Sequence, residues 1–97
     1  MQKLIQAAIF NDERYIESAD FENERLEGID ISGFEFKNVT LKSCTFYQCN
    51  FSKASFYGCE LINCDFSNCA FPDGYMRDTN ITQCKCNGAN YSFSYFK

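Results

Sequence analysis

The sequence contains no histidine and only one proline among its 97 residues. Without an imidazole side chain, it can form no Ser–His or Cys–His catalytic pair and no histidine-ligated metal site. It also lacks a glycine-rich phosphate-binding loop. Its carboxylates are scattered along the chain, which is typical of solvated surface positions. We therefore expect a protein that is not an enzyme and that needs no cofactor.

Long apolar runs are also missing. No stretch approaches the roughly 20 apolar residues that a membrane span needs, and the first residues lack the pattern of a signal peptide. We therefore expect a cytoplasmic protein that does not contact membranes. The net charge is −4. Nine acidic against three basic residues give residues 1–35 a net charge of −6. Because no basic patch accompanies them, we do not expect direct binding to nucleic acid.

What the sequence does have is a period of five. Chance would give such an unbroken run only on the order of a few times in a million. The period fits neither a helix nor a single strand, so it indicates a solenoid whose units stack on their neighbours. A bulky or apolar residue recurs at sixteen consecutive fifth positions, which are Phe21, Leu26, Ile31, Phe36, Leu41, Phe46, Phe51, Phe56, Leu61, Phe66, Phe71, Met76, Ile81, Cys86, Tyr91 and Phe96.

The position two residues before each of these is usually small. It is Ala, Cys, Gly, Ser or Thr in twelve of the sixteen repeats. Because a free cysteine behaves as a small buried hydrophobe, we predict buried, reduced and metal-free thiols in this inward slot. Zinc bound by Cys64, Cys84 and Cys86 is the alternative, although parallel coils would hold thiols in a column rather than a tetrahedron. Six of the seven cysteines occupy the slot, namely Cys44, Cys49, Cys59, Cys64, Cys69 and Cys84.

The repeat unit is a small residue, a polar residue, a central apolar residue and two more polar residues. Cys49-Asn50-Phe51-Ser52-Lys53 and Ala89-Asn90-Tyr91-Ser92 are examples. Over residues 19–97 this resembles the pentapeptide-repeat proteins, and the Phe and Cys preference resembles their quinolone-resistance branch. The resemblance implies an all-β fold, a right-handed quadrilateral parallel β-helix of about four coils with four pentapeptides in each.

Two units are expected, an N-terminal cap segment at residues 1–16 and the β-helix at residues 17–97. The cap begins with apolar residues and is expected to cover the first coil. The five-residue register could begin at Ile16, but Arg14 in the preceding small slot argues against a regular repeat there. Glu24 is the one acid in a small slot. It either reaches solvent at the end of the solenoid or is a buried acid with a raised pKa, which would mark a site.

With twenty residues in each coil, positions 20 apart should stack on adjacent coils. Lys37, Tyr57 and Arg77 then share one outward column, with Tyr75 and Tyr95 beside it. Such a column is either a solvated surface with cation–π support or a recognition face, because aromatic residues next to arginine are typical of binding hot spots. A neighbouring face carries the acidic candidates Asp20, Glu22 and Glu60.

These features leave three functions open. The first is a non-catalytic solenoid that binds a protein partner through its outer faces. The second is implied by the resemblance alone, a DNA mimic that binds DNA gyrase or another type II topoisomerase. The third is a purely structural solenoid. We also predict a homodimer through the C-terminal coil, where nothing in the sequence caps the apolar residues Tyr91, Phe93, Tyr95 and Phe96.

Overall fold

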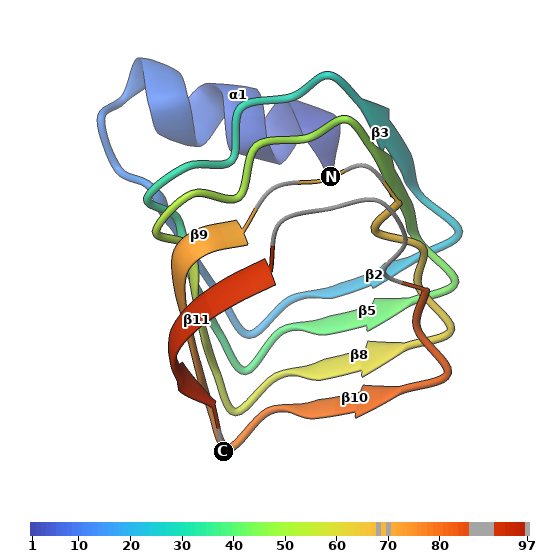
Figure 1. The fold of residues 1–97 in the computed structure, drawn as a ribbon. Coiled ribbons are helices and arrows are strands. Elements are labelled where there is room, and N and C mark those ends of the chain that lie inside the picture. The colour runs from blue at the N-terminus through green and yellow to red at the C-terminus, as the bar shows by residue number, and fades with distance from the viewer. Residues whose placement is uncertain (68, 70, 86–90, 97) are drawn as a thin grey trace.

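The protein is one short helix followed by a parallel β-solenoid (Figure 1). The computed structural model describes residues 1–67, 69, 71–85 and 91–96, with only the main chain described for 71–73 and 91–96. In that part of the chain, no helix is long and apolar enough to span a bilayer. The helix is α1 (Gln2–Phe10), and the strands are β1 (Tyr15–Glu17), β2 (Asp20–Glu22), β3 (Arg25–Glu27), β4 (Glu35–Lys37), β5 (Thr40–Lys42), β6 (Thr45–Tyr47), β7 (Ser55–Tyr57), β8 (Glu60–Ile62), β9 (Phe71–Arg77), β10 (Asn80–Thr82) and β11 (Tyr91–Phe96).

The strands form the sides of the solenoid. One side is the five-stranded sheet β1-β4-β7-β9-β11, the next is the four-stranded sheet β2-β5-β8-β10, and the third begins with the pair β3-β6. A parallel bridge from Asp30 to Asn50 marks the fourth side. Strands pair with those 20 residues further along, as in Asp20 with Thr40 and Thr40 with Glu60. The all-β parallel solenoid that the resemblance implied is therefore confirmed, with three full turns between β2 and β10 where about four coils were expected.

The corners explain why the chain turns after every short strand. At twelve corners the residue two places after the central position has a positive φ, between 52° and 70°. Asn, Asp, Ser and Gly tolerate this left-handed conformation, so they favour turns at these positions. The corner residues are Ser18, Asn23, Gly28, Gly33, Asn38, Ser43, Gln48, Lys53, Gly58, Asn63, Asp78 and Gln83.

Stacked phenylalanine rings fill the interior. The Phe46 and Phe66 rings are parallel with centroids 5.1 Å apart, and the Phe36 and Phe56 rings stack at 4.9 Å. Phe51 meets Phe46 edge-on at 5.4 Å. The predicted inward positions are confirmed for the buried residues Leu26, Ile31, Phe36, Leu41, Phe46, Phe51, Phe56, Leu61, Phe66 and Met76.

Central residues of the repeat are less buried at the two ends of the solenoid. Phe21 is only half-buried, and Ile81 is 38% exposed, so a central position in the repeat does not by itself ensure burial. Ile81 lies on β10, the terminal strand of its sheet, and no further strand of that sheet packs beyond it. The predictions for the side chains of Phe71, Cys86, Tyr91 and Phe96 fall outside the described residues.

Helix α1 covers the other end of the solenoid (Figure 1). Its Ile5 is fully buried, and Met1, Ala8 and Ile9 pack against the same core. The first solenoid strand, β1, already includes Tyr15 and Ile16, so it crosses the expected boundary between the cap and the β-helix. The N-terminal segment therefore packs these apolar side chains over the first coil.

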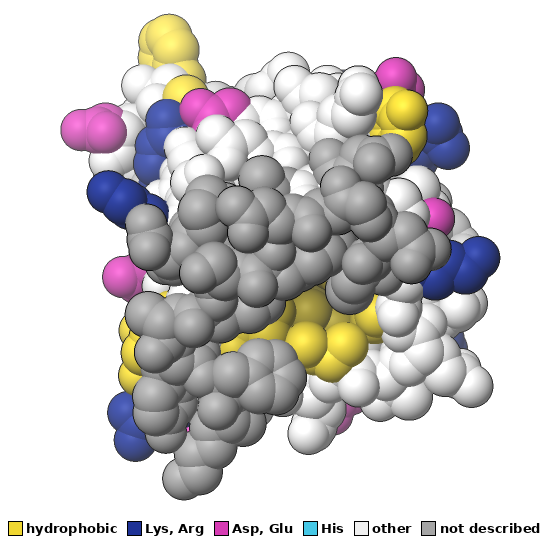
Figure 2. All heavy atoms as spheres, viewed as in Figure 1, with side chains coloured by type: hydrophobic (Ala, Val, Ile, Leu, Met, Phe, Trp, Pro, Cys, Tyr) yellow, Lys and Arg dark blue, Asp and Glu magenta, His cyan; other side chains and the backbone are white. Residues whose placement is uncertain are grey.

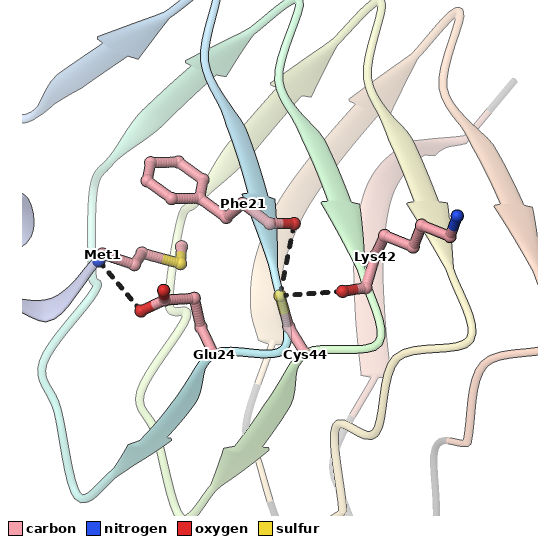
Figure 3. Close-up of polar contacts among 5 residues, drawn as sticks. All are labelled: Met1, Phe21, Glu24, Lys42 and Cys44. Carbon is pink, nitrogen blue, oxygen red and sulfur yellow. Dashed lines mark hydrogen bonds and ion pairs between the residues drawn. The ribbon is translucent and has the colours of Figure 1, made fainter.

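Glu24 is half-exposed and meets the N-terminal ammonium of Met1, whose nitrogen lies 3.0 Å from its Oε1 (Figure 3). The acid therefore lies at the end of the solenoid with an opposite charge beside it. This arrangement agrees with the first of the two interpretations of Glu24, in which the side chain reaches the surface at the capped end.

The inward thiols make hydrogen bonds between coils. Cys59 donates to the Phe36 carbonyl at 3.2 Å, and Cys64 donates to the Leu41 carbonyl at 3.2 Å. Cys44 has two acceptors, the carbonyl of Phe21 in the neighbouring coil and the carbonyl of Lys42 in its own coil (Figure 3). The acceptors in the neighbouring coil, Phe21, Phe36 and Leu41, are central residues of the repeat. The slot is therefore suited to a small side chain that is apolar but can also donate a hydrogen bond.

Candidate partner-binding surfaces

The outward column predicted on the five-stranded sheet exists. Lys37 is in register with Tyr57, and Tyr57 with Arg77. The Tyr57 and Tyr75 rings touch, with centroids 5.4 Å apart and planes tilted by 45°. Both rings are half-buried, whereas Lys37 and Arg77 are exposed. We refer to Lys37, Tyr57, Tyr75 and Arg77 as the aromatic column.

The two cations of the aromatic column have only loose ion pairs. Lys37 Nζ lies 3.9 Å from a Glu17 carboxylate oxygen, and Arg77 Nε lies 4.0 Å from Asp78. All four side chains are largely exposed, and such surface pairs contribute little to stability. Both cations can therefore exchange these contacts for those of a partner at low cost.

A shallow depression of about 330 Å³ lies at the start of the column, lined by Tyr15, Glu35, Lys37 and Tyr57. Desolvation, followed by the hydrogen bond and charge of Glu17, raises the pKa of Tyr15 above its ordinary value. Tyr15 therefore keeps its hydroxyl proton at neutral pH. The depression combines two aromatic rings with one charge of each sign.

The acidic candidates share a face but do not form a continuous strip. Asp20 and Glu22 lie on β2 and Glu60 on β8, with β5 between them. On β5, Thr40 separates Asp20 from Glu60, and Lys42 is in register with Glu22. The view in Figure 2 shows acidic and basic side chains interspersed around the surface. The acidic residues thus lie apart, with a lysine among them.

The residues predicted for self-association belong to the terminal strand of the five-stranded sheet. β11 spans Tyr91–Phe96 and pairs in parallel with β9, with register shifts near Phe93. Among the described strands it is the last in the order of this sheet. The predicted side-chain contacts of Tyr91, Phe93, Tyr95 and Phe96 lie outside the described residues.

The zinc alternative cannot be built from what the structure describes. In the part of the chain whose side chains the structure describes, no three of His, Cys, Asp or Glu are grouped to hold a metal ion. Cys86, which the zinc alternative required, lies outside this part of the chain. The six described cysteines are free thiols.

Comparison with known proteins decides the family. The model of pentapeptide repeats matches eight copies, over residues 19–58, 35–71 and 59–90. The chain belongs to the pentapeptide-repeat family.

Two solved structures resemble this pentapeptide-repeat protein. One is the pentapeptide-repeat protein Rfr23 from the cyanobacterium Cyanothece 51142, with 8% identity, a TM-score of 0.40 and coverage of 95% of this chain and 100% of that one. The other is QnrB1, a plasmid-mediated fluoroquinolone resistance protein, with 18% identity and a TM-score of 0.35. That match covers 72% of this chain and 56% of the QnrB1 chain. No curated protein matches the pentapeptide-repeat protein described here.

Sequence reasoning missed Tyr15, which lies one coil before Glu35 in the same outward column of this pentapeptide-repeat protein. Arg14, in the small slot, had argued against extending the register that far. The structure shows how the arginine is accommodated. Its guanidinium lies 5.6 Å from the centre of the Phe34 ring and donates a hydrogen bond to the Ser32 carbonyl at 2.8 Å. The 20-residue spacing from Tyr15 to Glu35 was the signal that could have found it.

Proposed function

We propose that this pentapeptide-repeat protein is a non-catalytic module that binds a macromolecular protein partner through the aromatic column. The observation that carries the proposal is the contact between the Tyr57 and Tyr75 rings on an outer face, flanked by Lys37 and Arg77. Tyrosine and arginine are enriched among binding hot spots. Tyrosine also gives a large contact area for the loss of few rotatable bonds.

The interior supports this choice of surface. The described part of the core is occupied by stacked rings such as Phe46 and Phe66, and solenoids generally present extended binding surfaces on their outer faces. The pentapeptide-repeat solenoid family is generally non-enzymatic. The proposed partner is a protein in the cytoplasm, recognised through aromatic contact and charge pairing.

The test is quantitative affinity capture with matched variants. Tyr57→Ala and Arg77→Ala should each reduce recovery of a specific partner by at least about tenfold, the usual consequence of losing a hot-spot residue. Tyr47→Ala is the control, since Tyr47 is another half-buried outward tyrosine on β6. Equal loss with the Tyr47 variant, or full recovery with all three variants, would contradict the proposal.

DNA mimicry directed at gyrase is the second candidate. It is favoured by the exposed acids Asp20, Glu22 and Glu60 on strands of one sheet, and the intervening Lys42 weakens it. A mimic should inhibit DNA supercoiling by gyrase and compete with duplex DNA. The combined variant Asp20→Asn, Glu22→Gln and Glu60→Gln should abolish that inhibition. Gyrase activity that the protein leaves unchanged would remove this candidate. If neither set of variants affects any partner, the purely structural function remains.

We also propose that the protein forms a homodimer through its terminal strand β11. The open edge of a parallel sheet invites pairing with another chain, and β11 is such a terminal strand. Sedimentation at micromolar concentration should then show a dimer that Phe96→Glu converts to a monomer. A monomeric wild-type protein with an equally stable Phe96→Glu variant would contradict the proposed dimer.

A further inference from the structure

A second surface lies where α1 meets β1. Three of the exposed large hydrophobic residues gather on these two elements and their connection: Leu4 is 46% exposed, Phe10 is 89% exposed and Tyr15 is 43% exposed. Between the elements is a depression of about 180 Å³ whose lining includes Leu4, Ala7, Glu13, Tyr15 and Ile16. We refer to this depression as the helix groove. It has room for one aliphatic side chain.

The strand that borders the helix groove lies at an edge of its sheet. Among the described strands β1 pairs only with β4, and its Tyr15 N–H donates to the Glu13 carbonyl at 2.8 Å, so an added strand would use the remaining main-chain groups of Tyr15–Glu17. Such an edge can accept an extended peptide as an additional strand, with main-chain hydrogen bonds giving affinity and pockets selecting side chains. In β1, Ile16 points to the core while Tyr15 and Glu17 point outward. A strand added beside β1 would alternate in the same way.

The charges around the groove select a cationic occupant. Glu13 lines the groove, and Glu17 and Glu35 face outward from β1 and from its neighbour β4. Lys37 Nζ lies 3.9 Å from a carboxylate oxygen of Glu17. The guanidinium of Arg14 is already engaged with the Ser32 carbonyl and the Phe34 ring. The first 35 residues together carry a net charge of −6, from nine acidic and three basic residues.

We propose that the helix groove binds an extended peptide segment of alternating aliphatic and basic residues, added as a strand against the edge of β1. One aliphatic side chain enters the groove against Leu4 and Ala7, and the other lies outside the groove on the same side of the added strand. The basic side chains lie on the outer side, towards Glu17 and Glu35. The helix groove shares no lining residue with the aromatic column, although Glu17 and Glu35 lie beside Lys37, so variants of the groove itself test this proposal separately.

The test uses fluorescence anisotropy with three labelled peptides and the full chain. The probe is the octapeptide Gly-Ser-Leu-Arg-Leu-Arg-Gly-Ser. In one control both leucines are replaced by serine, and in the other both arginines are replaced by glutamate. The probe should bind at least about tenfold more tightly than either control, because burying a leucine and pairing a cation each contribute binding free energy. Equal affinity for the serine control would show electrostatic attraction alone and overturn the proposal.

Variants of the protein locate the site. Ala7 is exposed and lines the groove, so Ala7→Phe should fill it and weaken binding by at least about tenfold. Glu17→Gln should weaken binding a few-fold and reduce its salt dependence. Tyr47→Ala, on β6 in a different sheet, should leave binding unchanged. Circular dichroism checks that each variant is folded, and if Ala7→Phe is not, Leu4→Ser serves instead. Unchanged affinity in the groove variant would overturn the proposal, as would probe-induced amide chemical-shift changes that avoid Tyr15–Glu17.

Discussion

Cys59 is a position at which the contribution of the inward-slot hydrogen bonds to stability can be measured. Its thiol is 1% exposed and donates to the carbonyls of Phe36 at 3.2 Å and Tyr57 at 3.4 Å. The neighbouring coils place Val39 and Thr79 in the same column, and the Thr79 hydroxyl makes the same two bonds, to Phe56 and Arg77, at 3.1 Å each. Thr and Val are therefore both compatible with the slot, and they differ by one hydrogen-bond donor.

From these contacts we expect a definite order of stability. Cys59→Thr should change the free energy of unfolding by less than about 1 kcal/mol, because the donor is kept. Cys59→Val should cost about 0.5–1.5 kcal/mol, the net contribution of one hydrogen bond. Cys59→Ala should cost about 1–2 kcal/mol, because it also leaves a small cavity. Urea unfolding followed by circular dichroism measures all three variants.

Two results would refute this reasoning. One is a valine variant as stable as the threonine variant, which would show that the donor contributes nothing and that the slot selects for size alone. The other is rapid reaction of Cys59 with a thiol reagent in the native state at pH 7. Burial raises the pKa of Cys59 above its ordinary value, so the group should remain an inaccessible, protonated thiol.

The remaining predictions concern the core, a corner and a surface turn. Phe66→Ala should cost about 3–5 kcal/mol in urea unfolding, because Phe66 is 3% exposed and stacks on Phe46; a cost below about 1 kcal/mol would contradict the stacked core. Lys53→Asn should raise the unfolding free energy by about 0.5–1 kcal/mol, since Lys53 has a φ of 58°, and a lower midpoint would argue against strain there. The side-chain hydrogen bond from Ser67 lowers the pKa of the Asp65 carboxyl, so this stabilisation is present at neutral pH and is lost as pH falls through the lowered pKa. Ser67→Ala should therefore be less stable than wild type at pH 7 and approach it in acid, and a stability difference independent of pH would contradict this.

Most of the fold could be predicted from the sequence, because the period of five determines which side chains face inward. The 20-residue register followed from the resemblance to pentapeptide-repeat proteins, which implies four repeats in each coil, and it placed Lys37, Tyr57 and Arg77 in one column. Burial at central positions such as Phe46 and Phe56 depends only on having a coil on each side. The repeat shows both that these side chains face inward and that a coil lies on each side of them.

The ends could not be predicted in the same way, because burial there depends on what covers them. Ile81 has the same sequence pattern as Leu61, yet it is 38% exposed on the terminal strand. Helix α1 is outside the repeat, so neither the helix groove nor the contact between Met1 and Glu24 has a periodic signal. The hydrogen bonds of the thiols were also missed, since a cysteine in a small slot indicates size and not its acceptors.

Site-specific photo-crosslinking in cells tests the central claim most directly. A photoreactive phenylalanine analogue at position 57 places the reactive group in the aromatic column, and the same analogue at position 47 replaces another half-buried outward tyrosine. The proposed function predicts a discrete protein adduct from position 57 that weakens when Arg77 is changed to Ala, and no such adduct from position 47. The same adducts from both positions, or none from position 57, would contradict recognition through the aromatic column.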